Sequence, residues 1–542
     1  SGNASHFLFG SDRDANNKAL LTNNDGSYYG TSYSVTHSST GFAISSTTSG
    51  DVNESNHEYC SWSFRKAPKF FDVVTYTGTS SAKTVNHNLG SVPGMIIIKC
   101  TSGTGNWRVY HRGLDGGNAP EDYVISLNLA NAQNDSSSYW NDTAPTSTQF
   151  TVGGDDDVND FGDTYVAYLF AHNDGDGGFG AASDQDIIKC GAYVGGGSSD
   201  VSVNLGFKPQ WLLFKSYTTS EDWFIVDSSR RWNGYGQADH LKPRLISSEG
   251  EFDGSSAGVR LTATGFTMTG NSNDNNGETD GYIYVAIRHG PLAEPSSSSG
   301  FFAAQVRSGN SGDPLIAPSS PSFKSDFITI RKRDAGEDTQ AHIRSIGNQY
   351  HRTNSSIGAS NAESSFGLKW QAEGFKINTN NAAYNGNGTN NYIDLFWRQA
   401  PSYFDIIGYK GTGSNRTVSH SLGVAPDMIW FKQEDGNGEW EVYHSGVGAT
   451  KALRLNSSGD PSTNSGYFNN TAPTASVFTV GTLSDVNGNG NKFTALLFGT
   501  LAGVTKVGSY TGNGNDSQTI DCGFTNSSKF VLIKNTAPGG DW

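Results

Sequence analysis

The chain has 542 residues and a formal net charge of −15, and only 16% of its residues are charged. This acidic balance argues against a nucleic-acid partner, because phosphate backbones are bound by basic surfaces. No apolar run reaches the roughly 18 residues of a membrane span, and SGNASHFLFG at the start lacks the pattern of a signal peptide. The length allows roughly three to five domains.

Aromatic residues (12%) and 67 glycines favour short strands separated by many turns. In chain order, residues 1–66 come first. They resemble the second half of a repeat, because GFAIS at 41–45 has a counterpart in GFKIN at 374–378. We therefore predict that 1–66 is the C-terminal part of a repeat domain.

Residues 67–178 are predicted to form a whole repeat, which we call type 1. Its apolar runs MIIIKC and TYVAYLF have the length of buried strands. In NWRVYHRG at 106–113 the side chains alternate, which predicts a strand with Trp107, Val109 and His111 on one face. This repeat returns at 400–502 with a constant offset, where FFDVVTYTG becomes YFDIIGYKG and NWRVYHRG becomes EWEVYHSG.

Three further stretches complete the predicted order. Residues 179–298 form a related repeat of type 2, which opens with KCGAYVG and contains VNLGFKPQWLLFK. Residues 299–399 form a divergent, type 2-like repeat. Residues 503–542 resemble the N-terminal part of a repeat that ends at its tryptophan.

The predicted fold class is all-β: a tandem array of antiparallel β-sandwich domains, jelly-roll or lectin-like, each of about 100–115 residues. A barrel is the alternative. The two end parts together have the length of about one repeat. We expect the chain to be a window from a longer array; alternatively, the two halves complete one domain within the chain or between neighbours.

Four tryptophans occupy one position of the repeat. They follow the opening tyrosine at a nearly constant distance, and they are Trp107, Trp223, Trp440 and Trp542. We predict that they are structural anchors in the core or on a sheet face, with sugar stacking as the alternative. The His111 position is histidine again at His444 but aspartate at Asp227, which argues against shared catalytic chemistry and favours surface or hydrogen-bonded strand residues.

The acidic loop GGDDDVNDFGD raises the possibility of calcium, since hard cations bind several oxygens at close range. The candidate ligands are Asp155, Asp157 and Asn159, with Asp485 and Asn487 in the second copy. A bidentate glutamate is missing at the last position of that copy, where Leu496 stands. A solvated hairpin loop is therefore the favoured prediction; we expect no cofactor, and calcium is the alternative.

Aromatic residues in polar loops have the chemistry of carbohydrate recognition, an apolar ring beside short hydrogen-bonding groups. The candidates are Trp140, Trp232, Tyr235, Tyr28 and Tyr29; the alternative is that they cover strand ends. The cysteines Cys60, Cys100, Cys190 and Cys522 are widely spaced, which favours buried apolar side chains over disulfides or metal ligands. No nucleophile, zinc or phosphate-loop motif is present, so we expect no enzymatic activity.

Two motifs, GFKPQW and VSHSLGVAP, together with NDTAPTSTQFTVG and the closing YVAYLFA, resemble the uncharacterised repeat domains of tail-fibre and other structural proteins of marine bacteriophages. The resemblance covers most of 57–300 and 400–542. It implies a virion appendage at which other virion proteins or copies of the chain are partners and host-surface glycans are candidate ligands. It brings no catalytic or binding residues. The alternative is a bacterial extracellular adhesin or filament subunit, and a polysaccharide-degrading spike is least favoured.

Overall fold

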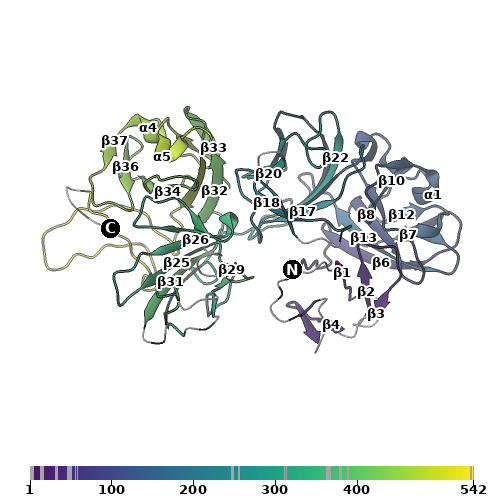
Figure 1. Ribbon diagram of the computed structural model, residues 1–542, viewed down its shortest axis with the longest axis horizontal. Helices are drawn as coiled ribbons and strands as arrows, with labels where there is room; N and C mark the ends of the chain where they lie inside the picture. The colour runs from purple at the N-terminus through teal and green to yellow at the C-terminus, as the bar shows by residue number, and fades with distance from the viewer. Residues whose placement is uncertain are drawn as a thin grey trace. The chain divides into compact units, whose positions relative to one another are not determined.

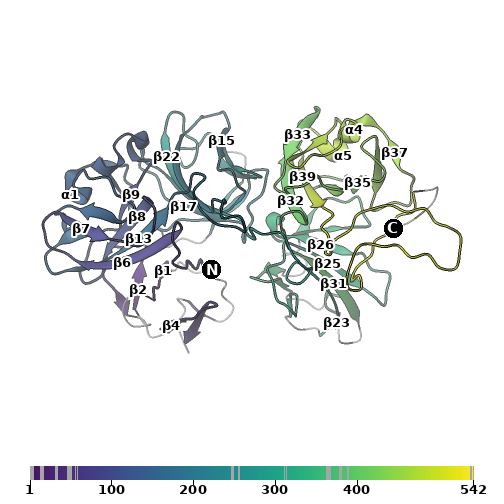
Figure 2. The ribbon, with the colours of Figure 1, turned by 180° about the vertical axis from the view of Figure 1, so that it is seen from behind.

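The computed structural model describes residues 5–11, 18–30, 34–45, 52–54, 57, 59–245, 249–253, 257–310, 312, 314–361, 368–377, 381–386, 388, 390–536, 540 and 542. In the part of the chain that the structure describes, nearly all of the regular secondary structure is antiparallel β-sheet (Figures 1 and 2). The prediction of an all-β, sandwich-type fold is confirmed. Within the described residues the α-helices are single turns, α1 (Ser137–Trp140), α2 (Asp156–Asn159), α4 (Ser465–Phe468) and α5 (Ser484–Asn487).

Two compact units make up the chain. The first contains residues 1–227, 238–259 and 266–289, and the second contains 228–237, 260–265 and 290–542. The finer division into six predicted ranges remains a prediction. For description we define four modules, each by the residues that its six-stranded sheet spans.

Module 1 spans 71–171. Its large sheet has the order β11-β10-β9-β8-β13-β6, and β12 pairs with β7 in a small second sheet. The strands are β6 (Phe71–Thr77), β7 (Lys83–Asn86), β8 (Pro93–Cys100), β9 (Arg108–His111), β10 (Tyr123–Ser126), β11 (Asn134–Asp135), β12 (Gln149–Val152) and β13 (Thr164–Ala171). Two 3-10 turns, η1 (Leu114–Gly117) and η2 (Pro120–Asp122), join β9 to β10.

Module 2 spans 188–288. Its large sheet has the order β14-β22-β16-β17-β18-β19, and its small sheet is β15-β21-β20. The strands are β14 (Ile188–Val194), β15 (Val201–Asn204), β16 (Pro209–Ser216), β17 (Phe224–Asp227), β18 (Ala238–Leu241), β19 (Gly250–Phe252), β20 (Ala257–Thr262), β21 (Gly265–Gly270) and β22 (Gly281–Arg288).

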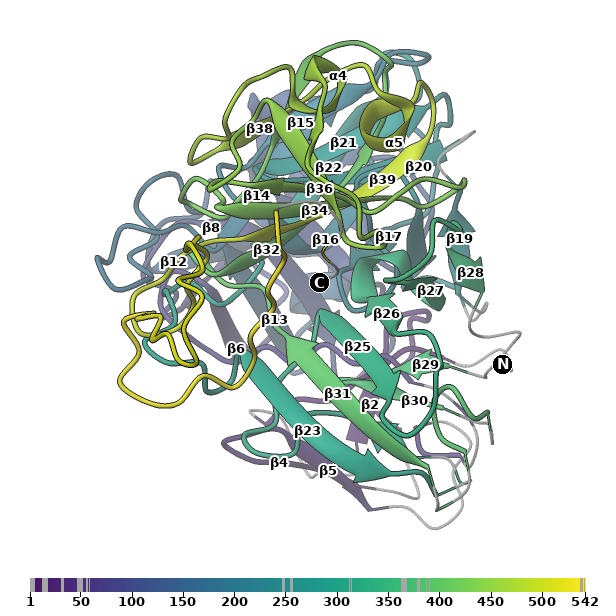
Figure 3. The same ribbon diagram turned by 90° about the vertical axis from the view of Figure 1, so that its left-hand side faces the viewer.

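Module 3 spans 302–397, with a large sheet β23-β31-β25-β26-β27-β28 and a small sheet β24-β30-β29; Figure 3 shows β23, β31 and β25 side by side. Its elements are β23 (Phe302–Ser308), β24 (Leu315–Ile316), β25 (Phe327–Lys332), β26 (Gln340–Ile343), η3 (Arg344–Ile346), β27 (Gln349–Arg352), β28 (Ser360–Asn361), β29 (Lys369–Trp370), β30 (Phe375–Lys376) and β31 (Asn391–Trp397).

Module 4 spans 404–498, with a large sheet β32-β39-β34-β35-β36-β37 and a small sheet β33-β38. Its strands are β32 (Phe404–Lys410), β33 (Arg416–Ser419), β34 (Met428–Gln433), β35 (Glu441–His444), β36 (Lys451–Arg454), β37 (Ser462–Thr463), β38 (Val477–Val480) and β39 (Lys492–Phe498).

The four large sheets have one strand order. In each sheet the first strand in the chain, which we call the opening strand, lies at one edge, and the last strand in the chain, the closing strand, lies beside it. The second, third, fourth and fifth strands follow toward the other edge. In module 4 the order is β32, β39, β34, β35, β36 and β37. The ladder registers also correspond. Lys99 in β8 lies opposite Val166, Lys215 in β16 opposite Ile283, and Lys432 in β34 opposite Thr494.

Both faces of the large sheets are covered, which explains the unbroken apolar runs. All eight residues of β8 are buried. In β34 successive side chains enter different cores: Ile429 and Phe431 pack with the small sheet of module 4, whereas Trp430 packs with Phe327 and Trp397 of module 3. A single core likewise runs from module 1 into module 2.

The two ends of the chain differ from the modules. Near the N-terminus a three-stranded sheet has the order β1-β2-β3, with β1 (Phe7–Leu8), β2 (Lys18–Leu21) and β3 (Tyr29–Gly30), and β4 (Ser34–His37) pairs with β5 (Phe42–Ser45). The described residues between 506 and 536 contain no strand.

Candidate functional site

The four tryptophans of the repeat make one hydrogen bond in common. In each case the indole N–H donates to the backbone carbonyl of the last residue of an earlier strand, which is β2 for Trp107 and the fourth strand of a module for the other three. The Nε1–O distances are 3.0 Å for Trp107 and Leu21, 2.9 Å for Trp223 and Ser126, 2.9 Å for Trp440 and Arg352, and 2.7 Å for Trp542 and Arg454. Each tryptophan therefore links its own part of the chain to the part that precedes it.

A lysine eight residues before each tryptophan makes a second common contact. Its ammonium group donates to a carbonyl oxygen just beyond the same earlier strand. The Nζ–O distances are 3.0 Å for Lys99 and Asp25, 2.8 Å for Lys215 and Ala130, 3.0 Å for Lys432 and Ser356, and 2.9 Å for Lys534 and Ser457. We call each lysine and tryptophan, with their two acceptor carbonyls, a Lys–Trp clasp.

The lysines also close their own loops. Lys99 donates to Gly105, Lys215 to Glu221, Lys432 to Gly438 and Lys534 to Gly540. Burial lowers the pKa of Lys99, Lys215 and Lys432 to about 8. A buried ammonium is costly unless hydrogen bonds compensate it, and the carbonyls of two modules supply them. The clasp therefore favours the joined arrangement, because separation would remove an acceptor from a group that water no longer solvates well.

Module 3 departs from this pattern. The ladder register places Arg331 where the lysine stands and Thr339 where the tryptophan stands. These two residues bond each other, with 3.0 Å from the Arg331 Nη1 to the Thr339 Oγ1. Clasps thus connect the N-terminal part to module 1, module 1 to module 2, module 3 to module 4, and module 4 to the C-terminal segment.

His111 strengthens the joint between modules 1 and 2. It lies in β9, as the predicted strand requires, and it is fully buried. Its Nδ1 accepts from the Gly113 N–H, so its Nε2–H donates to the Tyr284 carbonyl at 3.0 Å, in β22 of module 2. Burial lowers the pKa of the imidazole to about 3. His111 is therefore a neutral hydrogen-bonding group, not a base that solvent can reach.

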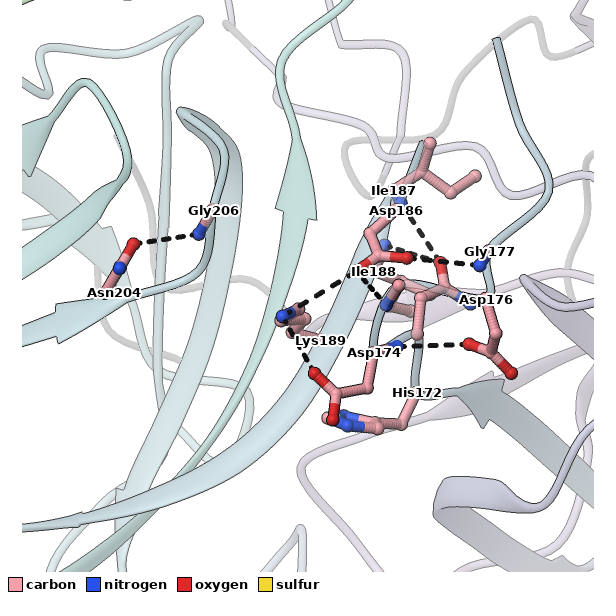
Figure 4. A network of polar contacts seen from close by, with 12 residues as sticks. His172, Asp174, Asp176, Gly177, Asp186, Ile187, Ile188, Lys189, Asn204 and Gly206 are labelled. Atoms are coloured by element: carbon pink, nitrogen blue, oxygen red, sulfur yellow. Dashed lines mark hydrogen bonds and ion pairs between the residues drawn. The ribbon is translucent and has the colours of Figure 1, made fainter. Parts of the chain in front are cut away.

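A polar network organises the chain between modules 1 and 2 (Figure 4). Asp186 accepts hydrogen bonds from the Gly175 N–H at 2.8 Å and the Gly177 N–H at 3.1 Å, and it lies 3.7 Å from Lys189. The Asn173 side-chain oxygen accepts from the N–H groups of 187 and 188. The acidic appearance of this loop therefore reflects carboxylates that bind backbone amides.

At the joint between modules 3 and 4 a buried pair adds to the clasp. The His351 Nε2 lies 2.6 Å from a carboxylate oxygen of Glu434, and both side chains are buried. The Ala359 N–H donates to the Glu434 carbonyl, and the Gly438 N–H donates to the Ser356 carbonyl. Backbone and side-chain contacts thus reinforce one another along this joint.

The predicted exposure of three glycan-binding candidates is wrong. Trp140 is 2% exposed and donates to the Tyr123 carbonyl, and Trp232 and Tyr235 are buried. The Tyr235 hydroxyl lies 3.3 Å from the Thr494 hydroxyl. These rings close strand ends and loops, which was the alternative for each of them, and they offer no face to a sugar.

The other two candidates lie near the N-terminus. Tyr28 is half-buried, with the Lys18 ammonium 5.1 Å from its ring centroid. Tyr29 is 46% exposed and its ring meets Phe7 edge-on. Tyr29 is therefore the candidate that keeps an accessible ring.

The residues predicted as calcium ligands in module 1 serve other contacts. Asp157 forms an ion pair with Arg108 at 2.6 Å, and Asp155 caps α2 by accepting from the Asp157 N–H. Asn159 is buried and donates to the carbonyls of Ser81 and Gly153. The geometry therefore does not support a calcium site here.

The second copy repeats this arrangement. Asn487 donates to the carbonyls of Ser414 and Gly481, and burial raises the pKa of Asp485. Across the described residues, no group of three or more His, Cys, Asp or Glu side chains is arranged to hold a metal ion. Calcium, the alternative to a solvated hairpin loop, is thus unsupported in both copies.

The predicted anchors and cysteines can be placed directly. Trp107, Trp223 and Trp440 are fully buried, whereas Trp542 is half-buried. The prediction that the cysteines are buried is correct for Cys100 and Cys190 and wrong for Cys60, which is exposed; Cys522 is partly buried. All four lie in the described part of the chain, and no disulfide joins them.

The clasp lysines were not predicted from the sequence. Their signal was a lysine at the end of each apolar run, IIIK, LLFK, WFK and LIK, always eight residues before the tryptophan.

Comparison with known proteins gives one family. A family model described as a domain of unknown function (DUF7483) matches residues 1–291 and 297–542. A comparison with curated proteins finds no match. None of the helices in the described part of the chain has the length and apolar character needed to cross a lipid bilayer.

Proposed function

The chain belongs to the DUF7483 family, and we propose that it is a structural protein: a serial array of β-sandwich modules in a bacteriophage virion appendage, outside the host cell. The observation that carries this proposal is the recurrent Lys–Trp clasp. The same donors and acceptors join successive parts of the chain at four places. Repeat arrays gain their stability from such nearest-neighbour interfaces.

The clasp suits a serial array because it lies at the joint between successive parts of the chain. Its acceptors are backbone carbonyls, which any residue type provides, so the recognition tolerates sequence change in the acceptor module. The acceptor residues are indeed dissimilar, being Leu21, Ser126, Arg352 and Arg454. Modules of different sequence can therefore follow one another along a fibre.

The bacteriophage assignment draws on the resemblance of GFKPQW and VSHSLGVAP to repeat domains of marine-phage appendage proteins. Attachment to host-surface glycans would be multivalent, since several weak sites on one array raise the overall avidity. Tyr29, with its accessible ring, is the starting point for a glycan-binding test. The structural role does not depend on glycan binding.

Immunogold electron microscopy on a crude phage lysate tests the proposal, with antibody raised against residues 70–300. Gold on fibres attached to virus particles is the expected result. Gold on bacterial surfaces or free filaments, with bare particles, would contradict it and would favour the adhesin alternative. A lysate from a phage that lacks the gene is the matched control for antibody specificity.

A further inference from the structure

The joint between modules 3 and 4 forms a pocket of about 340 Å³, and all of the residues that line it belong to the second compact unit. One wall is the loop 434–437 after β34, and another is the turn 357–359 after β27. Residues 235 and 237, which precede β18, contribute a third. The volume lies at the lower end of the range for small-molecule sites and suits a ligand the size of one sugar ring.

Hydrogen bonds and close packing hold these walls in place. The Glu434 N–H donates to the Lys492 carbonyl at 2.8 Å, and the Glu434 carbonyl accepts from the Ala359 N–H at 2.9 Å. Next to Tyr235, a Cβ on Gly234 would collide with the Gly408 carbonyl oxygen, so only glycine allows this close approach to β32. A pocket built in this way is formed before a ligand arrives, which lowers the entropic cost of binding.

The other clasps allow a comparison at two positions, one of which lines this pocket. They are the residue before each tryptophan's acceptor and the residue two positions after each clasp lysine. At the joint of modules 3 and 4 these are His351 and Glu434. At the other clasps the corresponding pairs are Leu20 and Thr101, Ile125 and Tyr217, and Leu453 and Thr536. The first member of all three is a buried aliphatic residue, so the packing of a joint does not require a histidine.

The His351–Glu434 pair is also incompletely satisfied. The two side chains are buried and lie 2.6 Å apart, but the His351 Nδ1 and the Glu434 Oε1 have no hydrogen-bond partner among the described residues. A buried carboxylate paired in this way is seldom more stable than an apolar pair of similar volume, and a buried acceptor without a donor is costly. Stability alone therefore does not explain these two residues.

The other residues that line the pocket indicate the class of ligand. The amides of Gln237, Gln349 and Asn437 can each donate and accept hydrogen bonds. Asp435 and Lys492 add one carboxylate and one ammonium group, so that with Glu434 the charged groups disfavour an anionic ligand. Hydroxyl groups also both donate and accept, and a neutral sugar carries several of them around one ring.

We propose that this pocket binds one ring of a neutral saccharide, with a hydroxyl group of the sugar donating to Glu434. The bound hydroxyl supplies the donor that the buried carboxylate lacks within the described residues. The inference deepens the proposed attachment to host-surface glycans, on which it rests, and names a site and a ligand class for it. Because the walls come from both modules, the sugar also bridges the joint.

Saturation-transfer NMR on the full chain tests the proposal. The probes are D-glucose, D-galactose, D-mannose, L-fucose, L-rhamnose and N-acetyl-D-glucosamine, with D-glucuronate as the anionic comparison. We expect saturation transfer to at least one neutral sugar and a weaker effect or none for glucuronate. No transfer to any of the six neutral sugars, or transfer to glucuronate alone, would overturn the proposal.

Variants then locate the binding. Gln349 is exposed and lines the pocket, and Gln349→Ala should weaken the affinity for the responding sugar about fivefold. Gln149→Ala is the matched control, because Gln149 is an exposed strand residue of module 1; it should leave the affinity unchanged. Equal affinities for Gln349→Ala and Gln149→Ala would place the sugar elsewhere and overturn the proposal.

A double variant, His351→Leu/Glu434→Thr, copies the residues of two other clasps. It should keep the circular dichroism spectrum of the wild-type chain but weaken sugar binding at least about tenfold, because the charged acceptor is gone. Unchanged binding in this variant would contradict the role of Glu434, and Gln349→Ala still decides the matter if the double variant does not fold. A negative sugar result leaves the immunogold result untouched, so the two proposals can fail separately.

Discussion

At the joint between modules 3 and 4, the Trp440 Nε1 lies 2.9 Å from the Arg352 carbonyl oxygen, and the indole is fully buried. Trp440→Phe keeps a ring but removes the donor, which leaves a carbonyl without its partner. We expect the free energy of unfolding of the second unit to fall by about 1–2 kcal/mol. Urea titration followed by intrinsic fluorescence measures the loss.

Trp430→Phe is the matched control for this prediction. Trp430 is also buried in module 4 and its ring contacts Trp440, but its Nε1 has no hydrogen-bond partner among the described residues. Both variants lose the same ring volume, so Trp430→Phe should cost less than Trp440→Phe by the worth of the clasp hydrogen bond. Equal losses for the two variants would show that ring packing, not the clasp hydrogen bond, holds the joint.

His111 gives the first joint a dependence on pH. Its pKa is about 3 in the folded chain and about 6.5 when unfolded, so the unfolded chain binds the proton first. The stabilisation is complete above about pH 6.5 and is lost as the pH falls toward 3. Between pH 7 and 4.5 we expect a loss on the order of 2 kcal/mol from this group.

The measurement is the free energy of unfolding at both pH values for the wild-type chain and for His111→Gln, which can still donate to the Tyr284 carbonyl. The variant should lose less stability on acidification, by about the amount given above. His172, whose pKa burial lowers to about 4, remains in both proteins and cancels in the comparison. An unchanged pH dependence in the variant would contradict the role of His111.

Among the elements, the single-turn helix α5 is fixed by one buried amide. The Asn487 side chain donates to the carbonyls of Ser414 and Gly481 at 2.7 and 2.6 Å, and it accepts from the Thr412 N–H. Asn487→Asp would place a carboxylate oxygen against two carbonyls, which should cost about 3 kcal/mol or more. Thermal unfolding compared with the exposed Asn489→Asp checks this, and the control should change little.

The elements also show what the sequence could predict. The strand at 108–111 followed from alternation, and the buried strands β8 and β13 followed from apolar runs. The burial of aromatic residues in loops could not be predicted in this way. Trp140 and Tyr235 lie in polar sequence, and distant chain segments bury them. The local sequence pattern does not show which side chains distant segments of the chain will bury.

Only half of the clasp could be predicted from the sequence. The tryptophans were predictable as anchors because their spacing from the opening tyrosine hardly varies. The lysines follow apolar runs and looked like ordinary strand ends. Their acceptors lie 74 to 85 residues earlier in the chain, so only the folded arrangement brings each lysine to them.

At the scale of the whole molecule, clasps and shared cores couple the modules in pairs. The core around Trp430 and Trp440 includes Phe327 and Trp397 of module 3, and one core likewise serves modules 1 and 2. Such coupling makes the stability of each module depend on its neighbour.

Single-molecule force spectroscopy on the full chain measures this pairwise coupling. We predict two major unfolding events, each releasing the contour length of two modules. In Lys432→Met/Trp440→Phe, the event from modules 3 and 4 should split in two or move to lower force, while the event from modules 1 and 2 stays unchanged. Four separate single-module events in the wild-type chain would show that the modules are not coupled in pairs. Identical traces for the variant and the wild-type chain would show that the clasp does not contribute to the coupling.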